Sequence, residues 1–125
     1  MGRVLLASPD TYWMEAMAAA VTALGHEALT VTDGRQAYET ALQTHPDIVF
    51  LDVALPVFNG FEVCQRIRSD PDFPSTLPVF LLTALEANPK KLEAVKGTGY
   101  FPKGTVGYKL NELLARYLAP GTPGR

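Results

Sequence analysis

The sequence has one cysteine, Cys64, and only 19% charged residues. A single cysteine excludes an intrachain disulfide and a cysteine-ligated zinc cluster, and it favours a reducing, cytoplasmic setting. The chain carries 11 lysines and arginines against 13 acidic residues, which gives a net charge of −2. Because nucleic acids are held mainly through clustered basic side chains, we expect no nucleic-acid binding through this domain.

Long hydrophobic runs are missing as well. The first apolar run, residues 4–7, is too short for a signal peptide or a membrane-spanning helix, so we expect no membrane attachment. With 47% hydrophobic residues in 125, the composition is that of one globular domain rather than a disordered chain. Residues 120–125 lack periodicity, so we expect a domain over 1–119 followed by a flexible tail or the start of a linker.

The chain instead contains a regular alternation of short apolar runs and helical patterns. The apolar runs predict strands at 4–7, 28–32, 48–51, 78–82 and 100–101. The segments between them carry apolar residues at helical spacing: up to Gly25, from Asp33 to the break at His45, over 60–68, over 89–95, and up to Leu118. Five consecutive strand–helix units predict an α/β fold, a doubly wound parallel sheet with helices on both faces.

Polar residues follow directly after four of these strands. They are Ser8-Pro9-Asp10, Asp52, Thr83 and Lys103. In a doubly wound sheet the functional crevice lies at the carboxyl ends of the strands, so we expect these residues to meet there. A carboxylate at Asp52 can act as a nucleophile, while the Thr83 hydroxyl and the Lys103 ammonium can hold the oxygens of a phosphoryl group.

The motifs around these residues resemble bacterial response-regulator receiver domains. Residues 51–56 read Leu-Asp-Val-Ala-Leu-Pro and are followed by Asn59-Gly60, as in the phosphoacceptor segment of that family. Leu82-Thr83-Ala84 is similar to its switch-hydroxyl segment, and residues 100–103 to the segment with its switch aromatic, Tyr100, and invariant lysine, Lys103. The resemblance covers about residues 3–118 and implies a flavodoxin-like three-layer sandwich with a five-stranded sheet in the order 2-1-3-4-5.

The resemblance also implies a function in two-component, or phosphorelay, signal transduction. Asp52 takes the place of the phosphoacceptor, and Thr83, Lys103 and Tyr100 that of the phosphoryl and switch pocket. The implied partner is a sensor histidine kinase or another signalling protein, contacted through an output face on the fourth helix, fifth strand and fifth helix. A homodimer through that face is compatible with the family, and we expect no enzyme activity.

The first strand departs from the family pattern. Receivers normally place two adjacent acids there, which hold Mg²⁺ together with the phosphoacceptor and a backbone carbonyl, but here those positions are Ser8 and Pro9. The remaining candidate ligands are Asp52, the Ala54 carbonyl and Asp10, so we expect Mg²⁺ to bind weakly or not at all. Asp10 is more readily explained as a helix N-cap than as a metal ligand.

Two further departures concern the output side. Gly104 replaces the family's proline after the invariant lysine, so we expect a trans peptide bond and a reshaped loop. The stretch from Thr83 to Tyr100 is shorter than usual, which predicts a short or irregular fourth helix. Tyr100 is as compatible with a plain strand aromatic as with a switch, and Cys64 is expected to be a small core residue.

Two other functions stay open. A pseudo-receiver adaptor, whose output face works without phosphorylation, agrees with Ser8, Pro9 and Gly104. A haloacid-dehalogenase-like phosphatase also uses a strand-end aspartate with threonine and lysine, but it needs a second acid two residues after the nucleophile, where this chain has Ala54.

Overall fold

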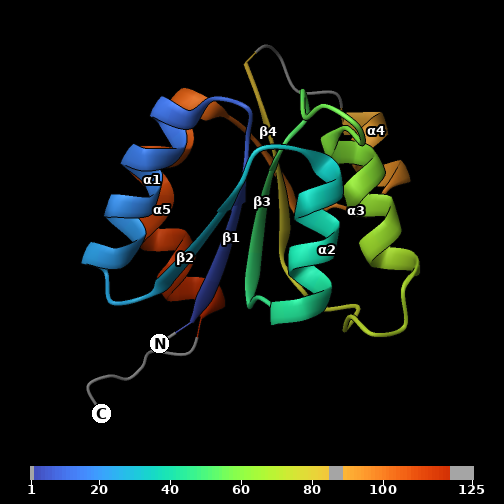
Figure 1. Cartoon of the computed structure of the whole chain (residues 1–125), viewed down its shortest axis with the longest axis horizontal. Helices are drawn as coiled ribbons and strands as arrows, with labels where there is room; N and C mark the ends of the chain where they lie inside the picture. The colour runs from blue at the N-terminus through green and yellow to red at the C-terminus, as the bar shows by residue number, and fades with distance from the viewer. Residues whose placement is uncertain (1, 85–88, 119–125) are drawn as a thin grey trace.

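The computed structural model describes residues 2–84 and 89–118. Its strands are β1 (Arg3–Ala7), β2 (Glu27–Val31), β3 (Ile48–Asp52), β4 (Val79–Thr83) and β5 (Gly99–Pro102). They form one parallel sheet in the order β2-β1-β3-β4-β5. The predicted α/β class and the strand order implied by the resemblance are therefore confirmed, and the carboxyl ends of the strands lie at the top of Figure 1.

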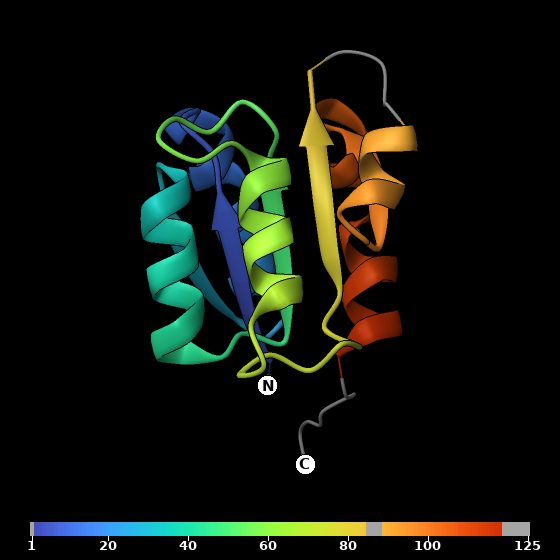
Figure 2. The same ribbon diagram turned by 90° about the vertical axis from the view of Figure 1, so that its right-hand side faces the viewer.

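Helices cover both faces of the sheet (Figure 1). They are α1 (Thr11–Ala23), α2 (Gly34–Thr44), α3 (Gly60–Ser69), α4 (Pro89–Ala94) and α5 (Lys103–Tyr117). Helices α1 and α5 pack on one face, and α2 and α3 on the other, where Figure 2 shows them side by side. The result is the expected three-layer arrangement.

The strand residues divide between two hydrophobic layers according to the two-residue period of a strand. Val4 and Leu6 point into the layer under α1 and α5, while Leu5 and Ala7 point into the layer under α2 and α3. All five residues of β3 and of β4 are buried, which explains why these strands read as unbroken apolar runs in the sequence.

Side chains cap the helices that begin near the carboxyl edge of the sheet. Asp10 accepts a hydrogen bond from the Trp13 backbone N–H at 3.0 Å, so the predicted N-cap of α1 is confirmed. Asn59 and Glu62 form a reciprocal capping box at the start of α3. These caps fix the points at which the chain leaves the candidate site and enters a helix.

Helices α4 and α5 differ in detail from the sequence expectations. Helix α4 has six residues, which confirms a short fourth helix but ends it at Ala94 rather than at residue 95. Helix α5 begins at Lys103, directly after β5, so the reshaped loop expected at this point is wrong. No cis peptide occurs in the described residues, and the bond before Gly104 is trans as expected. Pro102 has the extended conformation of an N-cap, and the helix starts without a side-chain cap.

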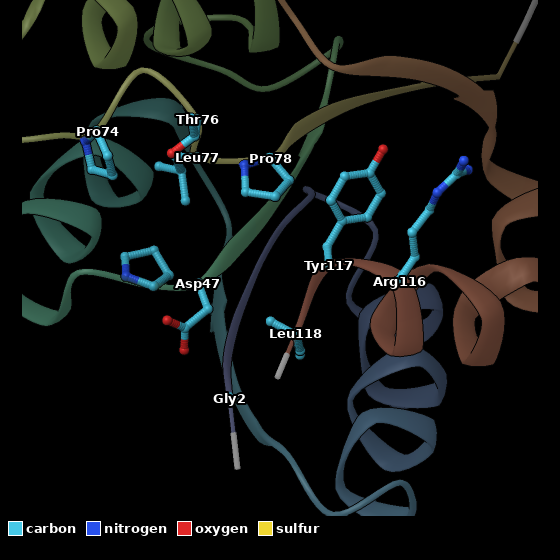
Figure 3. A pocket seen from close by; sticks show the side chains of 10 residues that line it. Gly2, Asp47, Pro74, Thr76, Leu77, Pro78, Arg116, Tyr117 and Leu118 are labelled. Carbon is cyan, nitrogen blue, oxygen red and sulfur yellow. The ribbon is translucent and has the colours of Figure 1, made fainter. Parts of the chain in front are cut away.

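A hollow of about 440 Å³ lies at the opposite, amino end of the sheet. Figure 3 shows Asp47, Leu77 and Tyr117 around it, with Leu118 below. It is formed by the segments that lead into the strands and by the end of α5. Because the polar strand ends lie at the other edge of the sheet, this hollow is separate from the candidate site.

The predicted boundary between 1–119 and 120–125 lies outside the described residues, so it stays a prediction. Within the described residues, no helix is both long and apolar enough to cross a membrane.

Candidate functional site

The candidate site lies where β1, β3 and β4 end and α5 begins. Ser8, Asp52 and Thr83 are the buried polar residues of the described core, with 0%, 3% and 5% of their surface exposed. Parallel pairing explains their proximity: Ala7 is in register with Leu51, so the next residues, Ser8 and Asp52, lie side by side. This is also the topological switch point, since the chain passes from β1 to β2 on one side and then crosses from β2 to β3 on the other side of β1.

Three groups in the described part of the chain contact the Asp52 carboxylate. Its Oδ1 accepts a hydrogen bond from the Ala54 backbone N–H at 2.9 Å. Its Oδ2 accepts one from the Ser8 hydroxyl at 2.9 Å and lies 3.1 Å from the Lys103 ammonium. A buried carboxylate needs such partners because desolvation disfavours its charge. Here they come from a backbone amide, a hydroxyl and a cation.

Lys103 is shared between two carboxylates. Its Nζ lies 3.1 Å from Asp52 Oδ2 and 3.4 Å from Asp10 Oδ2, and its side chain is only 18% exposed. The ammonium also lies 5.6 Å from the centre of the Trp13 ring, and the Trp13 indole N–H donates to the Lys103 backbone carbonyl at 3.3 Å. Trp13 thus contacts Lys103 at both its side chain and its backbone.

Ser8 is the site residue whose role the sequence interpretation missed. It was treated only as a poor replacement for a metal-binding acid. In the structure its hydroxyl donates to Asp52 and accepts from the Asp10 backbone N–H at 3.0 Å, so it links the β1 end to the β3 end. A polar residue directly after a fully buried strand was the available signal, because such a residue must find partners at the strand end.

Asp10 uses its two oxygens differently. Oδ1 caps α1 through Trp13, and Oδ2 faces Lys103. The hydrogen bond from the Trp13 backbone lowers the pKa of Asp10 below its ordinary value; partial desolvation opposes this, and the Lys103 charge adds to the lowering. Pro9, between Ser8 and Asp10, is exposed and offers no ligand side chain.

The other predicted residues lie on β4 and β5. Thr83 is buried at the end of β4, in register with Pro102 of β5, next to the start of α5. Tyr100 is half-buried on the α3 side of the sheet and packs edge-on against Phe61, with ring centres 5.9 Å apart. The structure therefore gathers Ser8, Asp10, Asp52 and Lys103 by direct contacts, while the Tyr100 ring packs against Phe61 of α3.

The loop after Asp52 is tightly closed and depends on a glycine. A Cβ at Gly60 would lie 2.6 Å from the Asp52 carbonyl oxygen and 2.9 Å from Val53 Cα, so only glycine allows α3 to start this close to β3. Within the same loop Val57 has a φ of 71°, which is strained for a β-branched residue, and it is 66% exposed. Local contacts of the loop, rather than residue preference, hold this conformation.

The remaining reactive side chains lie elsewhere. Cys64 is a buried core residue, as expected; its thiol donates to the Val95 carbonyl at 3.3 Å, and burial raises its pKa to about 11. His26 accepts a hydrogen bond from the Gly2 backbone N–H at 3.0 Å, and His45 ends α2 in the left-handed conformation. Among residues 2–84 and 89–118, no three His, Cys, Asp or Glu side chains gather as a set of metal ligands.

Comparison with known families and proteins gives a consistent result. The family model described as "Response regulator receiver domain" matches residues 4–113. The chain is 32% identical over 119 residues to "Response regulator MprA" of Mycolicibacterium vanbaalenii, covering 94% of this chain and 49% of that protein. This chain therefore spans about half the length of that relative.

Solved structures agree with this result. The chemotaxis protein CheY4 of Vibrio cholerae superposes with a TM-score of 0.84 at 28% identity, covering 94% of this chain and 99% of that one. The receiver domain of a sensor histidine kinase from Pseudomonas aeruginosa, described with a magnesium ion in its active-site cleft, superposes with a TM-score of 0.81 at 24% identity, covering 93% and 96%. At that identity the second match bears on the fold alone.

Proposed function

Because the chain belongs to the response regulator receiver domain family, we propose that it relays a two-component signal with Asp52 at the phosphoacceptor position. Domains of this family are signalling modules, and they interact with histidine kinases and other signalling proteins. The observation that carries the assignment of Asp52 is its buried carboxylate at the end of β3, 3.1 Å from the Lys103 ammonium. Membership in this family leaves the phosphatase alternative without support.

The surroundings of Asp52 support a role in binding a phosphoryl group. Lys103, the Ala54 backbone N–H and the Ser8 hydroxyl are donors around the carboxylate, and Thr83 is buried one strand away. Phosphoryl transfer depends mainly on positioning and on neutralising the oxygens of the transferred group. We assign Lys103 and Thr83 to the phosphoryl pocket. Tyr100 joins β5 to α3 and is assigned to the switch.

We further propose that Mg²⁺ binds weakly or not at all. Receiver domains generally bind this ion, and the Pseudomonas receiver is described with one. The residues present here do not fit it, because Asp52 and Asp10 already share an ammonium, Ser8 is neutral and Pro9 has no ligand atom in its side chain. Asp52, Asp10 and the Ala54 carbonyl remain the oxygen ligands that a weak site would use.

The same observation supports a second function, that of a phosphorylation-independent adaptor. Without a divalent ion, an anionic phosphoryl donor is repelled by two carboxylates that one lysine neutralises only in part. A buried pocket satisfied by Ser8 and Lys103 is stable without any ligand. In that case the surface formed by α4, β5 and α5, hereafter the output face, binds its partner in a constitutive state.

The proposed setting follows from composition and family. The partner is a sensor histidine kinase or another signalling protein in the cytoplasm, with no nucleic acid bound through this domain, and a homodimer is a further outcome to test. The chain covers about half of its relative MprA, so the output of a full-length protein lies beyond this proposal.

One experiment separates the two functions. The chain is incubated with acetyl phosphate, or with beryllofluoride, while Mg²⁺ is raised from zero to the millimolar range; intact mass and Trp13 fluorescence report the adduct. Acetyl phosphate adds a phosphoryl group to one Asp52 oxygen and releases acetate. A stoichiometric adduct that is absent in Asp52→Asn supports the phosphoacceptor and excludes the constitutive adaptor, whereas no adduct at any Mg²⁺ concentration excludes the phosphoacceptor role.

A further inference from the structure

We infer that Asp10 and Asp52 together hold the Lys103 ammonium as the resident cation of the pocket, so that Asp10 positions a lysine instead of a metal ion. The inference deepens the proposed function, because it takes Asp52 as the centre of the site. It assigns Asp10 a role that neither its sequence position nor its helix cap requires.

The geometry of Asp10 carries the first part. The backbone N–H of Trp13 donates to Oδ1 at 3.0 Å, which anchors the carboxylate at the start of α1. The second oxygen is then directed at Lys103 Nζ, 3.4 Å away. Because the first oxygen is held by backbone, the second does not need to be ordered by the lysine, and the pair loses little side-chain entropy when it forms.

Lys103 is also held at both ends. It is the first residue of α5, and its backbone carbonyl accepts the indole N–H of Trp13. Its ammonium lies between Asp10 and Asp52 and over the Trp13 ring at 5.6 Å. Asp10 and Trp13 belong to the start of α1, so one turn of this helix contacts the lysine through a carboxylate, an indole N–H and an aromatic face.

The charges in the pocket oppose the binding of a divalent ion. Two carboxylates and one ammonium leave a single net negative charge, and the ammonium already lies against one oxygen of each carboxylate. Removing the ammonium leaves two carboxylates with no cation. Hard divalent ions bind more tightly as the number of carboxylate ligands without a competing cation rises.

Manganese alone, detected by electron paramagnetic resonance, tests this without any phosphoryl compound. Lys103→Met is expected to bind Mn²⁺ about tenfold more tightly than wild type. Lys109→Met, which removes an exposed lysine from the same helix, is expected to leave affinity unchanged. Adding Asp10→Asn to Lys103→Met should abolish the gain, since asparagine keeps the helix cap but not the charge. Equal Mn²⁺ affinity in wild type and Lys103→Met, or a gain that survives Asp10→Asn, overturns the inference.

A second measurement keeps Lys103 in place and so does not depend on the folding of that variant. Competitive reductive methylation with peptide mass spectrometry compares Lys103 with the exposed Lys109 of the same chain. Asp10→Asn should raise the methylation rate of Lys103 several-fold and leave that of Lys109 unchanged; an unchanged Lys103 rate overturns the inference. Neither readout requires an adduct at Asp52, so the proposed function and this inference can fail separately.

Discussion

The residue after β1 differs in kind from the residues at the ends of β3, β4 and β5, although all of them lie at the site of the buried Asp52 carboxylate. At the ends of β3 and β4 and directly after β5 the chain has an aspartate, a threonine and a lysine, Asp52, Thr83 and Lys103, which are the residue types that the resemblance to receiver domains implies there. At β1 it has Ser8, whose hydroxyl donates to Asp52 and is fully buried. A buried carboxylate can thus be satisfied by a hydroxyl and a lysine, so the stability of this pocket is separable from its capacity for metal-dependent chemistry.

The largest expected effect is at Gly60, where the loop after β3 leads into α3. Gly60→Ala places a Cβ against the backbone of Asp52 and Val53, which cannot yield as a flexible side chain would. We expect a loss of about 3 kcal/mol in the free energy of unfolding. Gly104→Ala is the matched control, because a Cβ there meets nothing within 4 Å and alanine favours a helix interior. Urea denaturation of both variants checks this, and equal midpoints would refute the close approach.

The next prediction concerns the pH dependence of stability and the buried thiol of Cys64 on α3. Burial disfavours the thiolate and raises the pKa of the Cys64 thiol to about 11 in the folded protein, above its ordinary value of 9.0. Above pH 9 the unfolded chain releases this proton while the native chain keeps it. Stability is therefore fully present below pH 9 and is lost as pH rises toward 11, by at most about 3 kcal/mol. Cys64→Ala should remove this component from the pH dependence of unfolding; an identical slope in the variant would contradict the assignment.

A smaller effect is expected from a substitution at Ser8, the residue directly after β1. Ser8→Asp restores one of the family's acids and sets a carboxylate beside Asp52. Without metal we expect a loss of about 2 kcal/mol, since two neighbouring carboxylates repel and only Lys103 opposes them. Millimolar Mg²⁺ should recover most of this loss in the variant and leave wild type unchanged. Thermal unfolding with and without Mg²⁺ measures both, and a variant that ignores Mg²⁺ would count against the lost acid as the cause of weak metal binding.

The smallest expected effect comes from removing the Ser8 hydroxyl. Ser8→Ala deletes one donor to Asp52 and the acceptor of the Asp10 backbone N–H. We expect a loss of about 1 kcal/mol, because Lys103 and the Ala54 amide still hold Asp52. Chemical denaturation provides the value. A loss as large as that of Gly60→Ala would mean that the serine, rather than the loop, organises the site.

Most of the fold followed from local patterns. Short apolar runs predicted all five strands, with boundaries displaced by a residue at several ends, and the position of Asp10 before a helical pattern predicted its cap. The expected loop after Lys103 was wrong, because Pro102 already has the backbone of an N-cap and α5 begins at once. The absence of a proline at Gly104 indicated a trans bond correctly but said nothing about where the helix starts.

Within the site, the sequence determined which residues lie at the carboxyl edge. All strands of a parallel sheet end at that edge, so a polar residue that directly follows a strand lies there. Which of them touch was decided only by the tertiary structure. Ser8 and Asp52 are 44 residues apart, and Asp10 and Lys103 are 93 apart. The first pair meets because β1 and β3 are adjacent and in register; the second meets because α1 and α5 cover the same face of the sheet. Sheet order and helix packing, rather than the residues at the strand ends, set these distances and place an ammonium between two carboxylates.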